Sequence, residues 1–231
     1  MGQGPRAPRR RLKSRGTERM LMPHGESRAG RRDLAAVVPA AGYSSRMGAF
    51  KPLLPFDGAT VIERVITTIR EAGIESIRVV VGWQGERLIP VLERAGIPWV
   101  LNPRYAEGMY ASIQAGVRSL PAGVEGFFLL PGDMPLVRST TLTRLVAEWD
   151  ACPGGILYPS RQGKRGHPPL LARAYVPEIL AEAPAGGLRD LLSRHGQDAR
   201  DVECDDPGLL VDLDTPEEYR RGIQEASTGG V

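Results

Sequence analysis

The segment LAAVVPAAGYSSRMGAFKPLLP (Leu34–Pro55) places an apolar run directly before a loop of small and basic residues. The run Leu34–Pro39 is typical of a buried β-strand. Residues Ala40–Gly42 have small side chains or none, so backbone N–H groups there can approach an anion closely. Arg46 and Lys51 add two cations that suit phosphate oxygens. We therefore interpret the segment as a strand followed by an anion-binding loop.

Neither of two common phosphate-binding patterns occurs in this loop, because both GxxxxGK[ST] and GxGxxG are missing. An ordinary strand-to-helix connection with two solvated cations is the alternative interpretation. The rest of the chain provides a test, since ligands in open parallel sheets bind beyond the carboxyl ends of the strands. Residues with a chemical role should therefore follow predicted strands directly.

Strand-like and helix-like patterns alternate through the body of the chain. Residues 61–72 have helical spacing, with Thr60 and Glu63 as a capping box and Gly73 as the stop. This alternation is typical of βαβ units and predicts a mostly parallel sheet with helices on both faces. The predicted strands are Leu34–Pro39, Ile77–Gly82, Trp99–Asn102 and Phe127–Pro131, and the predicted helices lie near 61–72, Gly85–Ala95, Tyr110–Ser119 and Leu142–Trp149.

The pattern is less regular beyond residue 150. A final helix is predicted from Thr215 as N-cap, Pro216 in the first turn and Glu218 as the partner in a second capping box. No repeat and no linker divides residues 34–226, so we expect a single α/β domain. The other strand-like runs are ILYP (156–159), PLLA (169–172) and GLLVDLD (Gly208–Asp214), and helical patterns lie near Val176–Glu182 and Leu188–His195.

The basic residues are concentrated at the start of the chain. Residues 1–33 carry a net charge of +7, from ten Lys or Arg and three Asp or Glu, so −4 remains for the other 198 residues of a chain whose total is +3. With few apolar residues to pack, residues 1–33 are expected to form a disordered basic extension. A nucleic-acid or membrane-surface arm is the alternative. We expect no nucleic-acid or membrane partner for the domain at 34–226, and a flexible tail at 227–231.

The composition also favours a cytoplasmic location. No apolar stretch typical of a secretory signal follows the basic residues, and no run reaches the length of a membrane span. Cys152 and Cys204 lie far apart and without CxxC partners, so neither a disulfide framework nor a zinc site is expected. The three histidines are also isolated in the sequence, which argues against a histidine-based metal site.

Aspartates follow two of the predicted strands. Asp133 stands in PGDMP directly after the most hydrophobic strand, where a carboxylate is costly unless it is paired or binds a metal. Asp212 and Asp214 are two residues apart in a predicted strand, so both side chains should face the same way. Asp214 directly precedes a helix, so a role in the cap is a strong alternative interpretation for this residue. Asp133 and one of these aspartates could hold Mg²⁺, which prefers oxygen ligands and is commonly shared with substrate phosphates.

The chain contains four motifs that, in this order, resemble those of the nucleotidyltransferases that mature the molybdenum cofactor. They are LAAVVPAAGYSSRMGAFKPLL (34–54), LLPGDMPLV (129–137), GKRGHPPLL (163–171) and VDLDTPEEY (211–219). The resemblance is nearest to the cytidylyltransferase branch and covers about residues 34–226. It implies a Rossmann-like (GT-A-like) nucleotidyltransferase fold and an Mg²⁺-dependent transfer of CMP from CTP to the terminal phosphate of molybdopterin cofactor, with release of pyrophosphate. A molybdoenzyme or its chaperone would receive the product.

The resemblance also implies roles for particular residues. Arg46 and Lys51 would stabilise the charge that develops on the nucleotide phosphates, and with Asp133 they form the expected catalytic set. Asp133 would be the principal Mg²⁺ ligand and Asp212 the second. The expected nucleotide-binding set is Pro39, Ala40, Ala41, Gly42, Arg46, Lys51, Asn102, Gly108, Ser112 and Asp133, and the expected acceptor-binding set is Arg165, Gly166, His167 and Arg189.

Two departures from the family pattern bear on specificity. The guanine-using branch has a Gly-Gly pair where this chain has Ala41-Gly42, which favours CTP. The stretch AGGLRDLL (Ala185–Leu192) matches a GDxGxR-like region but lacks its aspartate, which leaves the acceptor open even if Arg189 keeps its role. His167 could donate to an acceptor phosphate or serve as a structural turn residue.

Three alternative functions remain. The nearest is a guanylyltransferase of the same family that uses GTP. A second is a nucleotidyltransferase acting on a sugar or polyol phosphate. A third, of another class, is a non-catalytic nucleotide sensor or cofactor-binding chaperone. The presence of Arg46, Lys51, Asp133 and Asp212 argues against the third, because a sensor has no need of metal-assisted chemistry.

Overall fold

The computed structural model describes residues 31–43, 47–181 and 184–229, and the main sheet within them is mostly parallel. Its strands are β1 (Arg31–Pro39), β4 (Ile74–Val81), β5 (Trp99–Leu101), β6 (Gly126–Leu129), β7 (Ile156–Arg161), β8 (Lys164–Arg165), β9 (Leu170–Ala172) and β10 (Ala199–Glu203). They follow the order β10-β7-β9-β6-β1-β4-β5, with β8 paired to β7. Only β8 and β9 run antiparallel to their neighbours in this sheet. The predicted Rossmann-like α/β fold is therefore confirmed.

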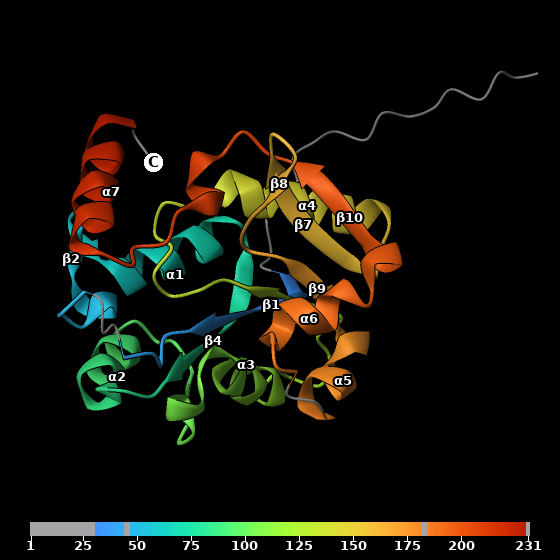
Figure 1. Cartoon of the computed structure of the whole chain (residues 1–231), viewed down its shortest axis with the longest axis horizontal. Helices are drawn as coiled ribbons and strands as arrows, with labels where there is room; N and C mark the ends of the chain where they lie inside the picture. The colour runs from blue at the N-terminus through green and yellow to red at the C-terminus, as the bar shows by residue number, and fades with distance from the viewer. Residues whose placement is uncertain (1–30, 44–46, 182–183, 230–231) are drawn as a thin grey trace, which may run out of the picture.

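Helices cover both faces of the sheet (Figure 1). The helices are α1 (Val61–Glu71), α2 (Gly85–Arg94), α3 (Met109–Arg118), α4 (Ser139–Ala151), α5 (Val176–Ala181), α6 (Gly187–Ser193) and α7 (Pro216–Gly229). On one face α1 packs against α4, and on the other α3 packs against α5 and α6. A small hairpin of β2 (Pro55–Phe56) and β3 (Ala59–Thr60) lies beside α7.

Burial of the central strands on both faces explains their uninterrupted apolar sequences. Residues Leu34–Val38 of β1 have no exposed surface, and all four residues of β6 are buried. The capping box predicted for α1 is present, since the Glu63 N–H donates to Thr60 Oγ1 and the Thr60 N–H donates to Glu63 Oε2. Gly73 takes a φ of +81° after this helix, a conformation that glycine adopts without strain.

Two ends of the predicted domain differ from the sequence-based expectation. β1 begins at Arg31, where it pairs with Ile74, so residues 31–33 belong to the first strand and not to an extension. Residues 1–30 lie outside the described part of the chain. At the other end α7 continues to Gly229, into the segment expected to be a flexible tail.

The predicted strand Gly208–Asp214 is wrong. The segment instead forms the 3₁₀ helix η5 (Pro207–Leu210) and then an irregular stretch up to α7. The buried side chain of Asp206 imposes this conformation, because its carboxylate accepts hydrogen bonds from the backbone N–H groups of Gly208 and Arg138 and from the Thr141 hydroxyl. The strand of this region is β10, which the sequence pattern did not reveal.

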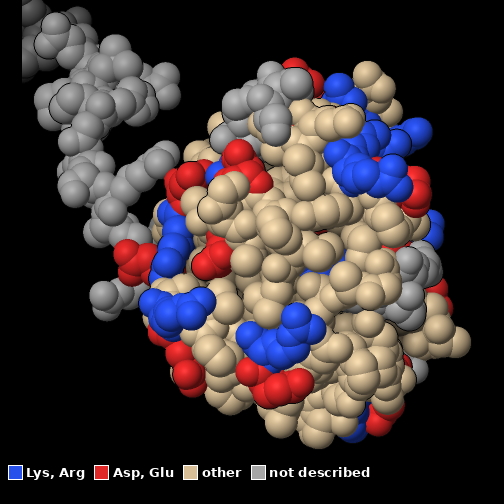
Figure 2. All heavy atoms as spheres, turned by 90° about the vertical axis from the view of Figure 1, so that its left-hand side faces the viewer, with Lys and Arg blue, Asp and Glu red and all other residues tan. Residues whose placement is uncertain are grey.

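The surface carries charges of both signs. Figure 2 shows acidic and basic side chains interspersed on the face that lies at the left of Figure 1. This face therefore lacks the single-sign character of surfaces that bind the nucleic-acid backbone. Among the helices of the described residues, none combines the length and the apolar character needed to span a bilayer.

Candidate active site

Three segments that are distant in sequence meet at the carboxyl ends of β1 and β6. The Gly132 N–H donates to the Pro39 carbonyl at 3.0 Å, which joins the loop after β6 to the end of β1. The Leu213 N–H donates to the Asp133 carbonyl at 3.1 Å, which brings in the segment before α7. The motifs that follow the two central strands therefore share one site, where open parallel sheets bind their ligands.

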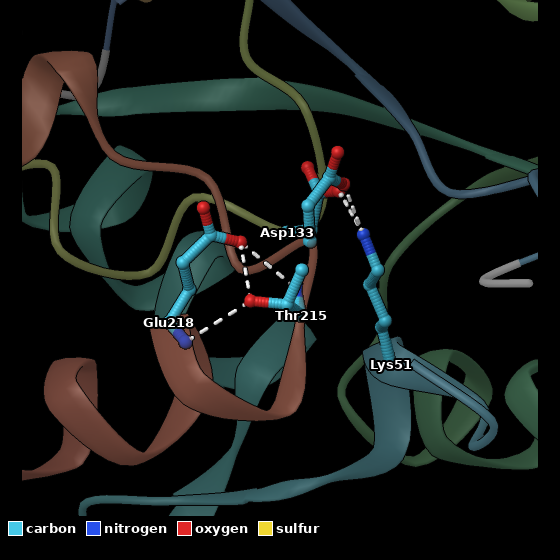
Figure 3. A network of polar contacts seen from close by, with 5 residues as sticks. Lys51, Asp133, Thr215 and Glu218 are labelled. Carbon is cyan, nitrogen blue, oxygen red and sulfur yellow. Dashed lines mark hydrogen bonds and ion pairs between the residues drawn. The ribbon is translucent and has the colours of Figure 1, made fainter. Parts of the chain in front are cut away.

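Lys51 links the carboxylates of two of these segments (Figure 3). It begins the 3₁₀ helix η1 (Lys51–Leu53), and its Nζ lies 3.1 Å from Asp133 Oδ2 and 2.5 Å from Asp214 Oδ1. The Lys51 side chain is only 9% exposed. Burial alone would lower the pKa of Lys51, but the hydrogen bonds and charges of Asp214 and Asp133 outweigh it and raise the pKa above its ordinary value. Lys51 is therefore a buried, charged ammonium between two carboxylates.

Asp214 does not act as the cap of α7. Thr215 and Glu218 form that capping box, in which the Thr215 N–H donates to Glu218 Oε2 at 2.8 Å and the Glu218 N–H donates to Thr215 Oγ1 at 3.2 Å (Figure 3). The predicted box is thus confirmed, and it leaves the Asp214 carboxylate to Lys51. The alternative interpretation of Asp214, a role in the cap, is therefore not the one that the structure shows, because Thr215 fills that position.

Asp212 lines the same cavity as Asp133 and Asp214. Burial, followed by the nearby negative charge of Asp214, raises the pKa of Asp212 above its ordinary value. The described residues contain no cluster of three or more His, Cys, Asp or Glu suited to hold a metal by themselves. Mg²⁺, however, often uses one or two carboxylates and completes its shell with water and substrate phosphates. The oxygen donors of Asp133 and Asp212 fit such a cation.

The site opens into two adjoining cavities, which we call the aspartate chamber and the second chamber. The aspartate chamber has a volume of about 540 Å³ and is lined by Asp133, Asp212 and Asp214. The second chamber has a volume of about 750 Å³ and extends towards α6. Both chambers share part of their lining, which includes Arg165 and His167. The two are therefore neighbouring parts of one cleft.

The expected acceptor-binding residues lie along this cleft. Arg165, Gly166 and His167 line both chambers, and Arg189 lines the second. The His167 side chain is accessible. Desolvation by the surrounding protein nevertheless lowers the pKa of His167. A hydrogen bond with the Leu129 backbone and the negative charge of Asp133 oppose this shift without cancelling it. The backbone N–H of His167 donates to the Leu209 carbonyl at 2.8 Å, so the residue also has a structural role.

The expected nucleotide-binding residues are only partly brought together. Pro39 lines the aspartate chamber, Ala40 and Ala41 are buried beside it in sequence, and Gly42 is exposed with open space at its Cα. Arg46 lies outside the described residues. Three further candidates do not line the aspartate chamber: Asn102 and Ser112 are buried and joined by a hydrogen bond of 3.0 Å, and Gly108 precedes α3 with a φ of +101°.

Sequence reasoning missed several residues of the cleft. Met109 and Leu188 line both chambers, and Tyr158 lines the second. Met109 and Leu188 resemble ordinary core residues in their helical patterns, so no local signal set them apart. Tyr158 belongs to a strand-like pattern, but the sequence alone does not show which face of the sheet its side chain lies on, because that depends on the neighbouring strands.

The chain is similar to several proteins of known name or structure. It is 28% identical over 186 residues to the molybdenum cofactor cytidylyltransferase of Escherichia coli (strain K12), which covers 79% of this chain and 92% of that protein. Among solved structures, Rv0371c of Mycobacterium tuberculosis H37Rv is 26% identical, with a TM-score of 0.72 over 83% of this chain and 97% of that one. Rv0371c has also been crystallised in complex with manganese.

A nucleotidyl transferase from Methanothermobacter thermautotroptrophicus is likewise similar, at 27% identity and a TM-score of 0.72 over 83% of this chain and 96% of that chain. The model of one family, the MobA-like NTP transferase domain, matches residues 36–199, which include the end of β1, Lys51, Asp133 and the strands β7 and β8. This match spans most of the chain and ends before Asp212 and Asp214. The chain therefore belongs to the family of proteins with a MobA-like NTP transferase domain, and it is a nucleotidyltransferase by family.

Proposed function

We propose that this protein transfers CMP from CTP to the terminal phosphate of a molybdopterin-type cofactor and releases pyrophosphate. The observation that carries the proposal is the ion pair of Lys51 with Asp133 and Asp214, two carboxylates that line the aspartate chamber of a two-chamber cleft. A cleft with cationic and metal-binding groups at one end suits a nucleoside triphosphate, and an adjoining chamber suits an acceptor. The similarity to the cytidylyltransferase of E. coli supports the choice of substrates.

The residues of the chain would act mainly by positioning and charge neutralisation. A phosphate acceptor is ionised at neutral pH and needs no strong general base. Lys51 and Arg46 would neutralise the charge on the triphosphate as the acceptor attacks the α-phosphorus and pyrophosphate leaves. Mg²⁺ held by Asp133 and Asp212 would supply Lewis-acid stabilisation. The product would pass to a molybdoenzyme or to its chaperone.

The preference for CTP rests on Ala41. Its methyl group is buried against the end of β4, where a Cβ built on Gly82 would lie only 2.7 Å from the Ala41 Cβ. The Trp83 N–H donates to the Ala41 carbonyl at 3.1 Å, so the loop is fixed to the same strand end. The guanine-using branch has a Gly-Gly pair where this chain has Ala41-Gly42, and on that ground we propose cytosine over guanine.

The test is pyrophosphate release with Mg²⁺ and each of CTP, GTP, ATP and UTP, with and without the molybdenum-loaded pterin cofactor. Release that requires both CTP and cofactor is the expected result. Release with GTP would assign the protein to the guanine-using branch. Release that requires a sugar or polyol phosphate would replace the acceptor. Nucleotide binding without any release would favour a sensor or chaperone. Asp205→Asn, at a side chain that is 96% exposed, is a suitable control beside Asp133→Asn.

A further inference from the structure

Tyr158, Arg165 and Asp201 come from three neighbouring strands and meet on one face of the sheet. Tyr158 in β7 and Asp201 in β10 are register partners. Arg165 in β8 is the partner of Ser160, which lies two residues from Tyr158 and therefore faces the same side. These three strands lie side by side at the edge of the sheet (Figure 1). The sheet register thus explains why the three side chains converge.

The contacts among the three fix the guanidinium of Arg165. Its Nε donates to Asp201 Oδ1 at 2.6 Å, and its Cζ lies 4.4 Å from the centroid of the Tyr158 ring. Burial raises the pKa of Tyr158, so the ring stays a neutral phenol that can face a cation. The terminal amino groups of Arg165 make no hydrogen bond with any side chain or backbone group of the described residues. Asp201 and Tyr158 therefore orient the guanidinium, while its terminal amino groups keep their hydrogen-bond donors for a ligand.

The hairpin that carries Arg165 is itself closely held. The Gly166 N–H donates to the Pro159 carbonyl at 2.8 Å. A Cβ built on Gly166 would lie 2.3 Å from the Leu209 carbonyl oxygen, so η5 packs directly against this backbone. Because η5 leads to Asp212 and Asp214, the position of Arg165 is fixed relative to the aspartate chamber.

Arg165 lines both chambers of the cleft, whereas Tyr158 lines only the second. The guanidinium therefore stands where the chambers meet. On one side are the carboxylates proposed to bind the metal and the nucleotide. On the other is a chamber with Tyr110 and Leu188 in its walls. A group that joins the contents of the two chambers would pass this point.

We propose that Tyr158 and Asp201 are positioning residues, which hold Arg165 so that its terminal amino groups bind the phosphate monoester of the acceptor. This inference rests on the proposed function and adds the residues that orient the acceptor. A guanidinium is well suited to the role, because its planar array of donors can bind two oxygens of one phosphate. It also offsets the repulsion between the acceptor phosphate and the triphosphate.

The first experiment compares Asp201→Asn and Tyr158→Leu with two matched controls. Tyr158→Phe keeps the aromatic face under Arg165. Glu203→Gln removes a carboxylate from the same strand, where Glu203 accepts from the Ser160 hydroxyl at 3.0 Å and does not contact Arg165. We expect the KM for the acceptor to rise roughly 3- to 10-fold in Asp201→Asn and roughly 2- to 5-fold in Tyr158→Leu. The kcat and the KM for CTP should stay close to those of the wild type, and both controls should behave like the wild type.

A merely structural role would lower kcat or change both KM values together, and that result would overturn the inference. Equal effects of Asp201→Asn and Glu203→Gln would overturn it as well. If Tyr158→Phe raised the acceptor KM as much as Tyr158→Leu does, the aromatic face would not position Arg165. That result also contradicts the inference.

A second measurement separates this inference from the proposed function. Phenyl phosphate, a simple phosphate monoester, is titrated into the full chain and its binding is followed by ³¹P NMR. The Kd should increase in Asp201→Asn and Tyr158→Leu but not in the two controls. This pattern supports the inference even if CTP and molybdopterin give no transfer, in which case only the proposed function fails. Absence of binding to the wild type, or equal binding by all variants, overturns the inference.

Discussion

Replacing Lys51 with methionine should lower the free energy of unfolding by about 2 kcal/mol. The change removes the ammonium and leaves Asp133 and Asp214 without their shared partner. Breaking a fully buried ion pair costs about 3–5 kcal/mol, whereas an exposed pair contributes about 0–1 kcal/mol. The lysine is 9% exposed but the two carboxylates are 26% and 31% exposed, so water offsets part of the loss. The expected cost therefore lies between the two limits.

A double-mutant cycle with Asp214→Asn tests the origin of this cost. In the Asp214→Asn background, Lys51→Met leaves one carboxylate instead of two, so it should cost about 1 kcal/mol less than in the wild type. Urea unfolding at neutral pH in EDTA, followed by tryptophan fluorescence, measures all four proteins. Lys51→Arg is the control that keeps the charge. Additivity of the two changes within about 0.3 kcal/mol would refute the ion-pair account.

Three further predictions follow from single contacts. Asp133→Asn should reduce pyrophosphate release roughly 10²-fold or more, with the urea unfolding free energy changed by no more than about 1 kcal/mol; near wild-type turnover in Mg²⁺ would exclude Asp133 as the principal metal ligand. Gly208→Ala should destabilise the fold by roughly 1–3 kcal/mol, because the added Cβ would lie 2.0 Å from the Leu136 carbonyl oxygen. Gly196→Ala is the control: its added Cβ would have no other atom within 4 Å, so its thermal unfolding should be close to that of the wild type. Burial and the hydrogen bond to Asp198 raise the pKa of Tyr175 to about 12. The difference in unfolding free energy between the wild type and Tyr175→Phe should therefore be constant below pH 10.0 and should fall as the pH rises towards 12. A difference that stays constant across that range would contradict this account.

The sequence predicted the central sheet well because its signals there are local. Each central strand is a short apolar run next to a helix of strong periodicity, and burial on both faces requires such a run. The same reasoning failed at Gly208–Asp214, whose alternating pattern resembles a strand. There the conformation depends on Asp206, which bonds backbone groups 68 residues away at Arg138 as well as its neighbour Gly208. A contact of that kind leaves no trace in a local pattern.

The candidate site was predictable to a similar extent. Lys51 and Asp133 each follow a central strand, so the rule that ligands bind at strand ends is enough to place them together. The role of Asp214 was not predictable, because a residue that precedes a helix has an equally good local explanation as a cap. Tyr158 and Asp201 were missed since their meeting with Arg165 depends on the pairing of β7 with β8 and β10.

If Asp133 binds the metal and Lys51 the triphosphate, as proposed, the ion pair between them would link metal and nucleotide binding thermodynamically. A divalent cation that binds Asp133 must compete with an ammonium that already contacts this carboxylate. The displaced ammonium then needs another anionic partner, and a triphosphate provides one. Binding of either ligand would therefore favour binding of the other. The affinity for Mg²⁺ should be higher with CTP present than without it, and by reciprocity the affinity for CTP should be higher in Mg²⁺. In the absence of nucleotide, the protein would hold its own cation in place of the metal.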